Sequence, residues 1–199
     1  CNDLNAGCVE FLKQFPNLTG LRMFRNKGLD DAAVAGLAEL KLKRLELRDL
    51  NVGNDGLVPL KAMSGLESVE VSELPSVDTS ALNEVLGAWT TLTSLNVFSM
   101  PATDETAKVI VAAMPNLKSL TLRATQLTDA AIDELVKLES LETLDLRDNA
   151  TLSADAMLKL ANMKSLRKIY VKGSGLGASD AASQLEQFKK AAPKCSVSL

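Results

Sequence analysis

The chain has 199 residues and a formal net charge of −3, so it can build one sizeable core but carries no field strong enough to attract nucleic acid or an anionic membrane. It contains no histidine, which removes the usual general base, the usual zinc ligand and the usual pH switch. Apolar residues make up 46% of the chain and aromatic residues only 4%, so aliphatic side chains must fill the core in thin, repeated layers.

The first residues are expected to form part of a repeat. The segment CNDLNAGCVEFLKQFPNL at the start aligns without a gap on ATQLTDAAIDELVKLESL, which begins at residue 124. The alignment places Cys8 on Ala131 and Leu12 on Leu135. The chain therefore starts partway through a repeat unit, and because it also begins without Met we expect it to be processed or excised from a longer chain.

Seven elements with the pattern Leu-x-x-Leu-x-Leu follow at a spacing of 24 to 26 residues. They read LTGLRMFRN, LKRLELRDL, LESVEVSEL, LTSLNVFSM, LKSLTLRAT, LETLDLRDN and LRKIYVKGS, and begin at Leu18, Leu42, Leu66, Leu92, Leu117, Leu141 and Leu166. A fixed period of this length indicates a solenoid. Since side chains alternate along a strand, the apolar first, fourth and sixth positions are predicted to point inward.

The segments between these elements are predicted to be helices. Each starts with Asp, Ser, Thr or Asn and then has apolar residues three and four apart. Thr103, Thr128 and Ser153 are natural N-caps. The acidic residues between Asp129 and Glu139 are therefore interpreted as capping and solvated residues of a scaffold, not as a catalytic cluster. The predicted helices span residues 30–40, 54–63, 79–89, 103–114, 128–138, 153–163 and 179–192.

This pattern resembles the leucine-rich repeat family, with ribonuclease-inhibitor-like repeats, over essentially the whole chain. The resemblance implies an α/β fold, a right-handed solenoid with a curved parallel β-sheet on its concave face and helices on its convex face. We expect a single domain over residues 1–199. It would comprise a partial N-terminal repeat (1–17), seven repeats (18–191) and a C-terminal capping strand (192–199).

Several conspicuous residues are interpreted as core. Trp89 precedes its strand by three residues, at a place that Met or Leu holds in other repeats, and Phe11 and Phe188 lie on helix faces. Cys8 and Cys195 occupy apolar positions and are predicted to be buried, inert thiols. An odd count of three cysteines without a Cys-x-x-Cys pair indicates neither a disulfide framework nor a metal site.

The last residues, PKCSVSL, suit a short final strand that closes the sheet. In such a strand Cys195, Val197 and Leu199 would alternate inward.

The cellular compartment stays open. An acylated Cys1 would anchor a lipoprotein, so processing or lipidation at Cys1 outside the cytoplasm is a minor alternative, although no lipobox is visible. No apolar run approaches the roughly 20 residues that span a bilayer, so we expect a soluble chain without a membrane span. Asn17 and Asn149 match the glycosylation pattern. Asn149, however, occupies the loop-turning place that members of the family usually bury.

The third, fifth, seventh and eighth positions of each element should face outward on the concave side. Read along the chain, they place a basic column beside a partly acidic one, interrupted by aromatic residues. Arginine with Tyr and Phe is the composition of interface hot spots. The alternative is that Arg and Asp on neighbouring strands pair with each other and merely keep the sheet soluble. We predict that a partner contacts Arg22, Phe24, Arg25, Arg48, Glu70, Phe98, Arg123, Asp145, Arg147, Tyr170 and Lys172.

The predicted function is a non-catalytic module that binds a protein or peptide on its concave face. The alternative is a recognition segment of a larger receptor, effector or adaptor whose activity lies outside this chain. We expect no enzyme, no metal and no cofactor, because no residues form a nucleophile and base pair, a phosphate loop or a metal cage. A nucleic-acid partner is not expected either, since acidic residues interrupt the basic column. A monomer is compatible with these features.

Overall fold

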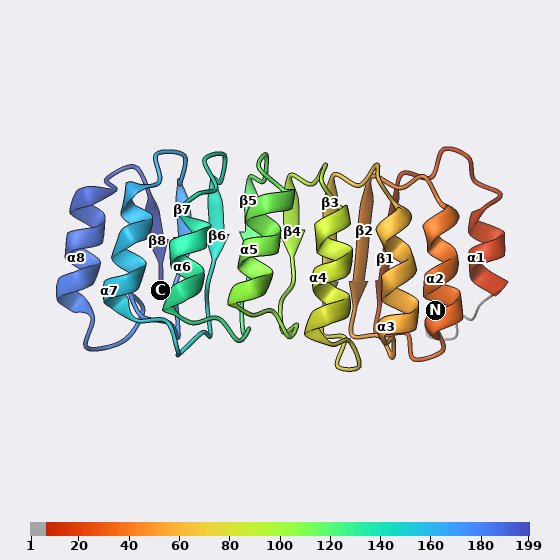
Figure 1. Ribbon diagram of the computed structural model, residues 1–199, viewed down its shortest axis with the longest axis horizontal. Helices are drawn as coiled ribbons and strands as arrows, with labels where there is room; N and C mark the ends of the chain where they lie inside the picture. The colour runs from red at the N-terminus through yellow and green to blue at the C-terminus, as the bar shows by residue number, and fades with distance from the viewer. Residues whose placement is uncertain (1–6) are drawn as a thin grey trace.

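The computed structural model describes residues 7–199, in which eight parallel strands form one sheet in chain order. Helices connect consecutive strands (Figure 1). The strands are β1 Gly20–Phe24, β2 Arg44–Arg48, β3 Ser68–Ser72, β4 Ser94–Asn96, β5 Ser119–Thr121, β6 Thr143–Asp145, β7 Lys168–Tyr170 and β8 Ser196–Ser198. The α-helices are α1 Gly7–Leu12, α2 Asp31–Gly36, α3 Asn54–Leu57, α4 Thr79–Ala88, α5 Asp104–Ala113, α6 Asp129–Leu135, α7 Ala154–Met157 and α8 Ala182–Ala191, and the short 3₁₀ helices are η1 Leu37–Glu39, η2 Val58–Ala62 and η3 Leu158–Asn162.

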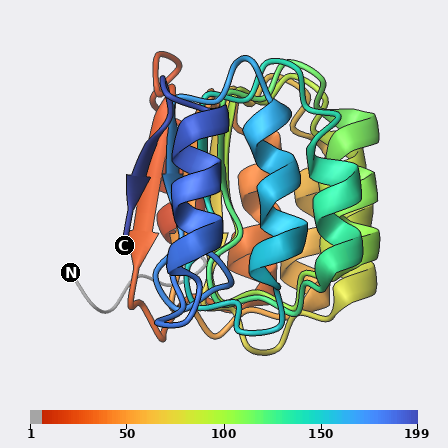
Figure 2. The same cartoon turned by 90° about the vertical axis from the view of Figure 1, so that its left-hand side faces the viewer.

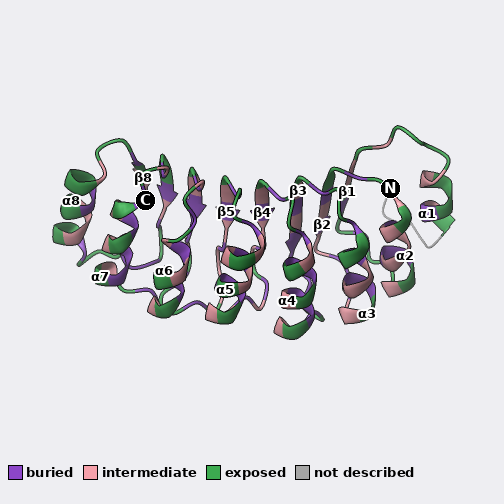
Figure 3. Cartoon of the chain, turned by 45° about the horizontal axis from the view of Figure 1, so that its top comes forward, coloured by how far each residue is buried: buried purple, intermediate pink, exposed green. Residues whose placement is uncertain are grey.

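The helices all cover the same face of the sheet. Seen from one end of the molecule, the strands form one layer and the helices the other (Figure 2). The row of helices bows outward and the strands line its inner side, so the uncovered face of the sheet is concave (Figure 3). The predicted α/β solenoid with a parallel sheet on the concave face and helices on the convex face is therefore confirmed.

The apolar positions of the repeat are in register across the sheet. The fourth position runs through the paired residues Leu21, Leu45, Val69, Leu95, Leu120, Leu144, Ile169 and Val197. Those from Leu45 to Ile169 are buried between the sheet and the helices. Each fully buried aliphatic side chain contributes about 1.5 to 3 kcal/mol relative to its exposed state, so the column forms the core of the solenoid.

A left-handed residue follows every strand from β1 to β7, at the eighth position of the element. The values of φ run from 49° to 72° at Arg25, Asp49, Glu73, Ser99, Ala124, Asp148 and Gly173. Only the last of these is a glycine, and the conformation costs other residues about 1 kcal/mol or more. An inter-strand hydrogen bond offsets this cost in each of the first six turns: the Arg25 N–H donates to the Arg48 carbonyl at 3.1 Å, and the Asp148 N–H to that of Lys172 at 2.9 Å.

The acidic residues at the helix starts connect neighbouring repeats. Asp129 accepts hydrogen bonds from the N–H and the Oγ of Ser153, both at 2.7 Å, and Asp104 does the same for Thr128 at 2.8 and 2.6 Å. Ser153 in turn caps α7 by accepting from the Ala156 N–H at 3.1 Å. The carboxylates of Asp104 and Asp129 are thus engaged by the scaffold, through bonds to the following repeat.

Two of the three aromatic residues assigned to the core are buried. Trp89 and Phe188 are fully enclosed, and the Trp89 indole N–H donates to the Leu60 carbonyl at 2.9 Å. The prediction for Phe11 is wrong, because this side chain is 57% exposed. It lies on α1, the first described helix, which packs against α2 and has no described helix on its other flank (Figure 1). Its ring instead meets the Phe15 ring edge to face at 5.1 Å.

Cys8 is half-buried and Cys195 is buried, and both are free thiols. Cys8 is thus less buried than predicted. Burial raises the pKa of each thiol, which disfavours the reactive thiolate form. The expectations for Cys1 lie outside the described residues.

Leu199 was expected to point inward but is 64% exposed. No helix within residues 7–199 is long and apolar enough to cross a bilayer.

Candidate functional site

All the residues predicted to contact a partner lie on β1 to β7 or in the turns that follow these strands. We call the side chains at the third, fifth, seventh and eighth positions of these elements the concave strip. Its cations are Arg22, Arg25, Arg44, Arg48, Arg123, Arg147, Lys168 and Lys172, and its anions are Glu46, Asp49, Glu70, Glu73, Asp145 and Asp148. The strip therefore carries a small positive excess in a chain whose net charge is −3.

The charge of the strip is unevenly distributed. The first element, on β1, contributes Arg22 and Arg25 without an acid, whereas the element on β3 contributes Glu70 and Glu73 without a base. The element on β7 again contributes only cations. The concave strip is thus positive at both ends and negative near β3.

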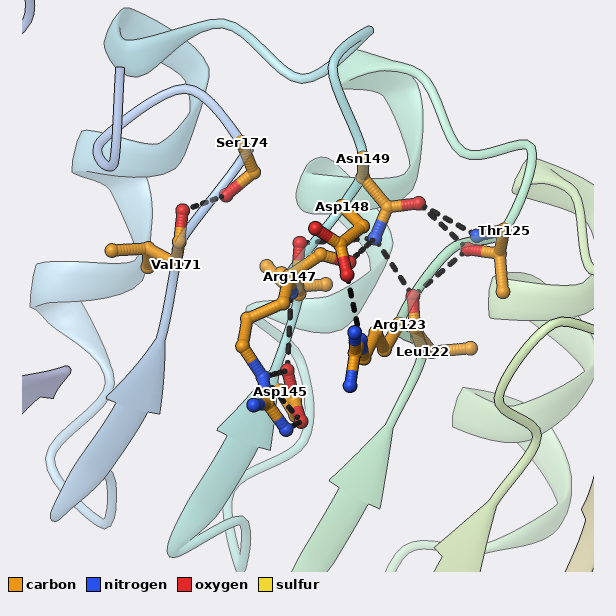
Figure 4. Close-up of polar contacts among 10 residues, drawn as sticks. Leu122, Arg123, Thr125, Asp145, Arg147, Asp148, Asn149, Val171 and Ser174 are labelled. Carbon is orange, nitrogen blue, oxygen red and sulfur yellow. Dashed lines mark hydrogen bonds and ion pairs between the residues drawn. The ribbon is translucent and has the colours of Figure 1, made fainter. Parts of the chain in front are cut away.

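Two arginines of the strip are held by carboxylates through two nitrogen atoms each. Arg147 donates to Asp145 from Nε at 2.9 and 3.1 Å and from Nη2 at 2.6 Å (Figure 4). Arg22 contacts Glu46 through Nε and donates from Nη2 at 2.9 Å. The hydrogen bonds to these carboxylates raise the pKa of both guanidinium groups. In the unbound chain, Arg22 and Arg147 are therefore paired with acids of the sheet, which was the alternative to a role in binding a partner.

Three other arginines among the predicted contact residues keep their terminal nitrogens available. Arg48 donates only from Nε, to Glu73 at 2.6 Å, and Arg123 only from Nε, to Asp148 at 2.6 Å. The Nε of Arg25 lies 3.5 Å from the Asp49 carboxylate. The Nη atoms of these arginines donate no hydrogen bond to any residue within 7–199. They can therefore accept new carboxylate or carbonyl partners without releasing a bidentate pair.

Two aromatic side chains of the strip, Phe98 and Tyr170, each lie between two cationic side chains. The guanidinium groups of Arg48 and Arg123 lie 5.7 and 5.0 Å from the ring centre of Phe98. Tyr170 has Arg147 at 5.1 Å and the Lys168 ammonium group at 4.6 Å. Such contacts stabilise exposed sites by about 0.5 to 1 kcal/mol each, so they hold the long cationic side chains in defined positions.

The first ring of the strip belongs to Phe24, which has the Arg22 guanidinium 5.1 Å away. Phe24 is 41% exposed and is the one large apolar side chain of the strip that is strongly exposed. It lines a hollow of about 180 Å³ together with Arg25 and Arg48. These three predicted residues are thus brought together at one end of the strip.

The remaining predicted residues have mixed surroundings. Glu70 accepts a hydrogen bond from the Ser72 hydroxyl at 2.8 Å. Lys172 is exposed and forms no ion pair with the described residues. The prediction missed Lys168, which contacts Tyr170 from the third position of its element. Reading the third position along the chain would have found it, since this position faces outward as the fifth and seventh do.

A buried amide fixes the turns that carry the arginines of β5 and β6. Asn149 is 1% exposed, and its Nδ2 donates to the carbonyls of Leu122, Leu146 and Arg147 at 2.8, 3.0 and 3.2 Å (Figure 4). Its Oδ1 accepts from the N–H and the Oγ1 of Thr125, both at 3.0 Å. The expected burial of Asn149 is confirmed, and its glycosylation pattern is inaccessible in the folded chain.

The described residues offer little for catalysis by a metal ion. Within residues 7–199 no group of three or more Cys, Asp or Glu side chains is arranged to hold a metal ion. A larger hollow of about 530 Å³ lies away from the concave strip and is lined by residues between Ala38 and Gly65. The arrangement on the strip is instead suited to contacts through charge and aromatic surface.

No family model matches the sequence, and no curated protein matches it either. Among solved structures, the chain is similar to an internalin (inlF) from Listeria monocytogenes, with a TM-score of 0.67 and 18% sequence identity. The similarity covers 94% of this chain and 49% of the internalin chain, so the chain spans about half the length of that protein. At this identity the likeness concerns the fold alone, and the fold of the chain is that of a leucine-rich-repeat solenoid.

Proposed function

We propose that the chain is a non-catalytic interaction module that binds a protein or peptide on its concave strip. The observation that carries the proposal is that three of the predicted contact arginines, Arg25, Arg48 and Arg123, have uncommitted terminal nitrogens. They lie among aromatic rings on a sheet whose backbone is fixed by continuous parallel pairing. Arginine and aromatic side chains on a rigid frame concentrate binding energy in few contacts, because little entropy is lost on binding.

Protein is favoured over nucleic acid by the charge pattern of the strip. Six carboxylates alternate with its cations, and the acidic pair on β3 interrupts any continuous path for a phosphate backbone. A protein surface can place opposite charges against both signs and gain specificity from the pattern. The same strip would serve as the recognition surface if the chain acted within a larger receptor, effector or adaptor.

The test is affinity capture of the partner from the source, followed by calorimetry with purified protein variants. The double variant Phe98→Ala and Arg123→Ala removes one ring and one free guanidinium, and we expect it to lose at least about 2 kcal/mol of binding free energy. Its melting temperature should change little, because neither side chain belongs to the leucine core.

The matched control lies on the convex face. Lys137 and Glu134 pair at 2.6 Å on the helix side, so exchanging them as Glu134→Lys and Lys137→Glu keeps an ion pair while reversing both charges. Binding should then change by less than about 0.5 kcal/mol. Loss of binding in this variant together with retained binding in the concave variant would assign the interaction to the other side of the solenoid.

A further inference from the structure

The hollow at the first end of the concave strip, lined by Phe24, Arg25 and Arg48, has the size of a side-chain pocket. Phe24 and Arg48 are register partners on β1 and β2, and Arg25 follows in the left-handed turn with φ of 49°. The volume is about 180 Å³. A cavity of about 150 Å³ in another protein holds a benzene molecule, so this hollow has room for one side chain of a partner.

At the hollow, Arg25 is only loosely paired with a carboxylate. Arg25 lies 3.5 Å from Asp49, which is longer than the roughly 2.7 to 2.9 Å of a charge-assisted hydrogen bond. The other oxygen of Asp49 accepts from the Lys27 ammonium group at 2.8 Å. Lys27 foremost, with Arg25 and Arg48 adding to it, lowers the pKa of Asp49. Asp49 is thus shared between Arg25 and Lys27, whereas Arg48 interacts with Glu73 and Glu70 on the β3 element.

Arg48 also borders the hollow and pairs with Glu73 through only one nitrogen. Arg48 donates from Nε to Glu73, which leaves its Nη groups for a ligand in the hollow. The Arg25 side chain is 81% exposed and donates no hydrogen bond to residues 7–199. Two guanidinium groups therefore border the hollow with unused donors, while the exposed ring of Phe24 supplies an apolar wall.

We propose that this hollow binds a carboxylate side chain of a protein partner whose neighbouring residue is apolar. The carboxylate accepts from Arg25 and Arg48, and the apolar neighbour packs on Phe24. The inference rests on the proposed function and adds the chemistry of the partner: the segment that enters this end of the strip is acidic and aliphatic. A polyanion is disfavoured, because Glu70 and Glu73 on the adjoining β3 element would repel its next charges.

The probe is a synthetic peptide, acetyl-Gly-Ser-Leu-Asp-Leu-Ser-Gly-amide, titrated into ¹⁵N-labelled protein at low salt and followed by NMR. We expect saturable shifts of the amide signals of Phe24, Arg25 and Asp49. A peptide with Asn in place of Asp should bind about five- to tenfold more weakly, since it keeps the shape and loses the charge. Replacing both Leu residues of the peptide by Ser should weaken binding by a similar factor.

The protein variants separate this site from general charge attraction. Arg25→Gln with Arg48→Gln should weaken binding of the peptide at least about tenfold, and Arg25→Gln alone by about threefold. Lys172→Gln removes one positive charge at the far end of the strip and should change binding less than about twofold. Unchanged signals from β4 to β7 in each variant would show that the fold is retained.

Any one of three results would overturn the inference: no saturable shift at the hollow, equal binding of the Asn peptide, or equal weakening by Lys172→Gln. The proposed function fails separately. If the captured partner depends on Phe98 and Arg123 but the peptide does not enter the hollow, the interaction module stands and the acidic subsite is wrong. If the peptide binds at Arg25 while the partner ignores every concave variant, the assignment of the functional face is wrong.

Discussion

The substitution Asn149→Ala should destabilise the solenoid far more than its small size suggests. Asn149 joins two turns: its Nδ2 donates to carbonyls of both, and its Oδ1 accepts from Thr125 in the preceding repeat. Alanine removes all of these contacts at a position that water does not reach, because the residue is 1% exposed. The turns after β5 and β6 would then lose the amide that ties them together (Figure 4).

The magnitude follows from which groups lose their only partner. The Leu122 carbonyl keeps the Thr125 hydroxyl at 2.9 Å, and the Arg147 carbonyl keeps the Ala124 N–H at 2.9 Å. The Thr125 N–H and the Leu146 carbonyl lose the partner that Asn149 provides. A buried polar group without a partner costs about 1 to 3 kcal/mol, so two such groups predict a loss of about 2 to 6 kcal/mol in the free energy of unfolding.

Urea unfolding monitored by circular dichroism measures this loss. For a slope near 2 kcal/mol per M, the midpoint should fall by about 1 to 3 M. Asn162→Ala is the matched control, because Asn162 is exposed on η3 and should change stability by less than about 0.5 kcal/mol. A loss below about 1 kcal/mol for Asn149→Ala, with an unchanged slope, would refute the view that this amide is the essential link between the turns.

Three further predictions concern the core, acid stability and the thiols. Leu144→Ala, at a fully buried site in mid-solenoid, should cost about 2 to 5 kcal/mol, measured by the same urea unfolding, and equal stability of variant and parent would show the leucine register to be misassigned. Hydrogen bonds from the Ala81 N–H and, to a lesser extent, from Asn54 lower the pKa of Asp78 in the folded chain, so on acidification the unfolded chain is protonated first. The stabilisation from Asp78 is therefore complete above the usual Asp pKa and is lost as the pH falls through the lowered pKa. The substitution Asp78→Asn should make the melting temperature fall less steeply on acidification. Mass spectrometry of the unreduced protein should find no intramolecular disulfide, and a bridge between Cys1 and Cys8 would contradict this.

The fold was predictable because its main determinant is periodic. The apolar positions recur in every repeat, so an error in placing one repeat would be visible by comparison with the adjacent repeats. The register of the strands follows from the same spacing. Phe11 is the exception among the aromatic residues assigned to the core. The alignment that places Leu12 on the buried Leu135 also places Phe11 on Glu134, a charged residue, so the sequence already indicated that position 11 does not face the core.

The turns were not predictable from residue types. Six of the seven left-handed positions hold Arg, Asp, Glu, Ser or Ala. Only Gly173 is a residue type that indicates a left-handed conformation. A hydrogen bond from the backbone N–H of these residues to a carbonyl of the next repeat favours this geometry. Such a hydrogen bond can be made by any residue type, so the sequence does not reveal it. The ion pairs on the concave face were not predictable either. Whether an arginine donates to a carboxylate through one nitrogen or two depends on its rotamer and on the residues of the neighbouring strand.

This distinction separates residues that hold the sheet from residues free to bind. Asp145 is 5% exposed and grips Arg147 through two oxygens, so breaking that pair would leave a buried carboxylate without its cation. The contacts of Arg25 and Arg123 are exposed, and exposed ion pairs are usually worth no more than about 1 kcal/mol. A partner can therefore replace the acids of Arg25 and Arg123 at little cost, whereas it must accept the Asp145 and Arg147 pair as a fixed part of the surface.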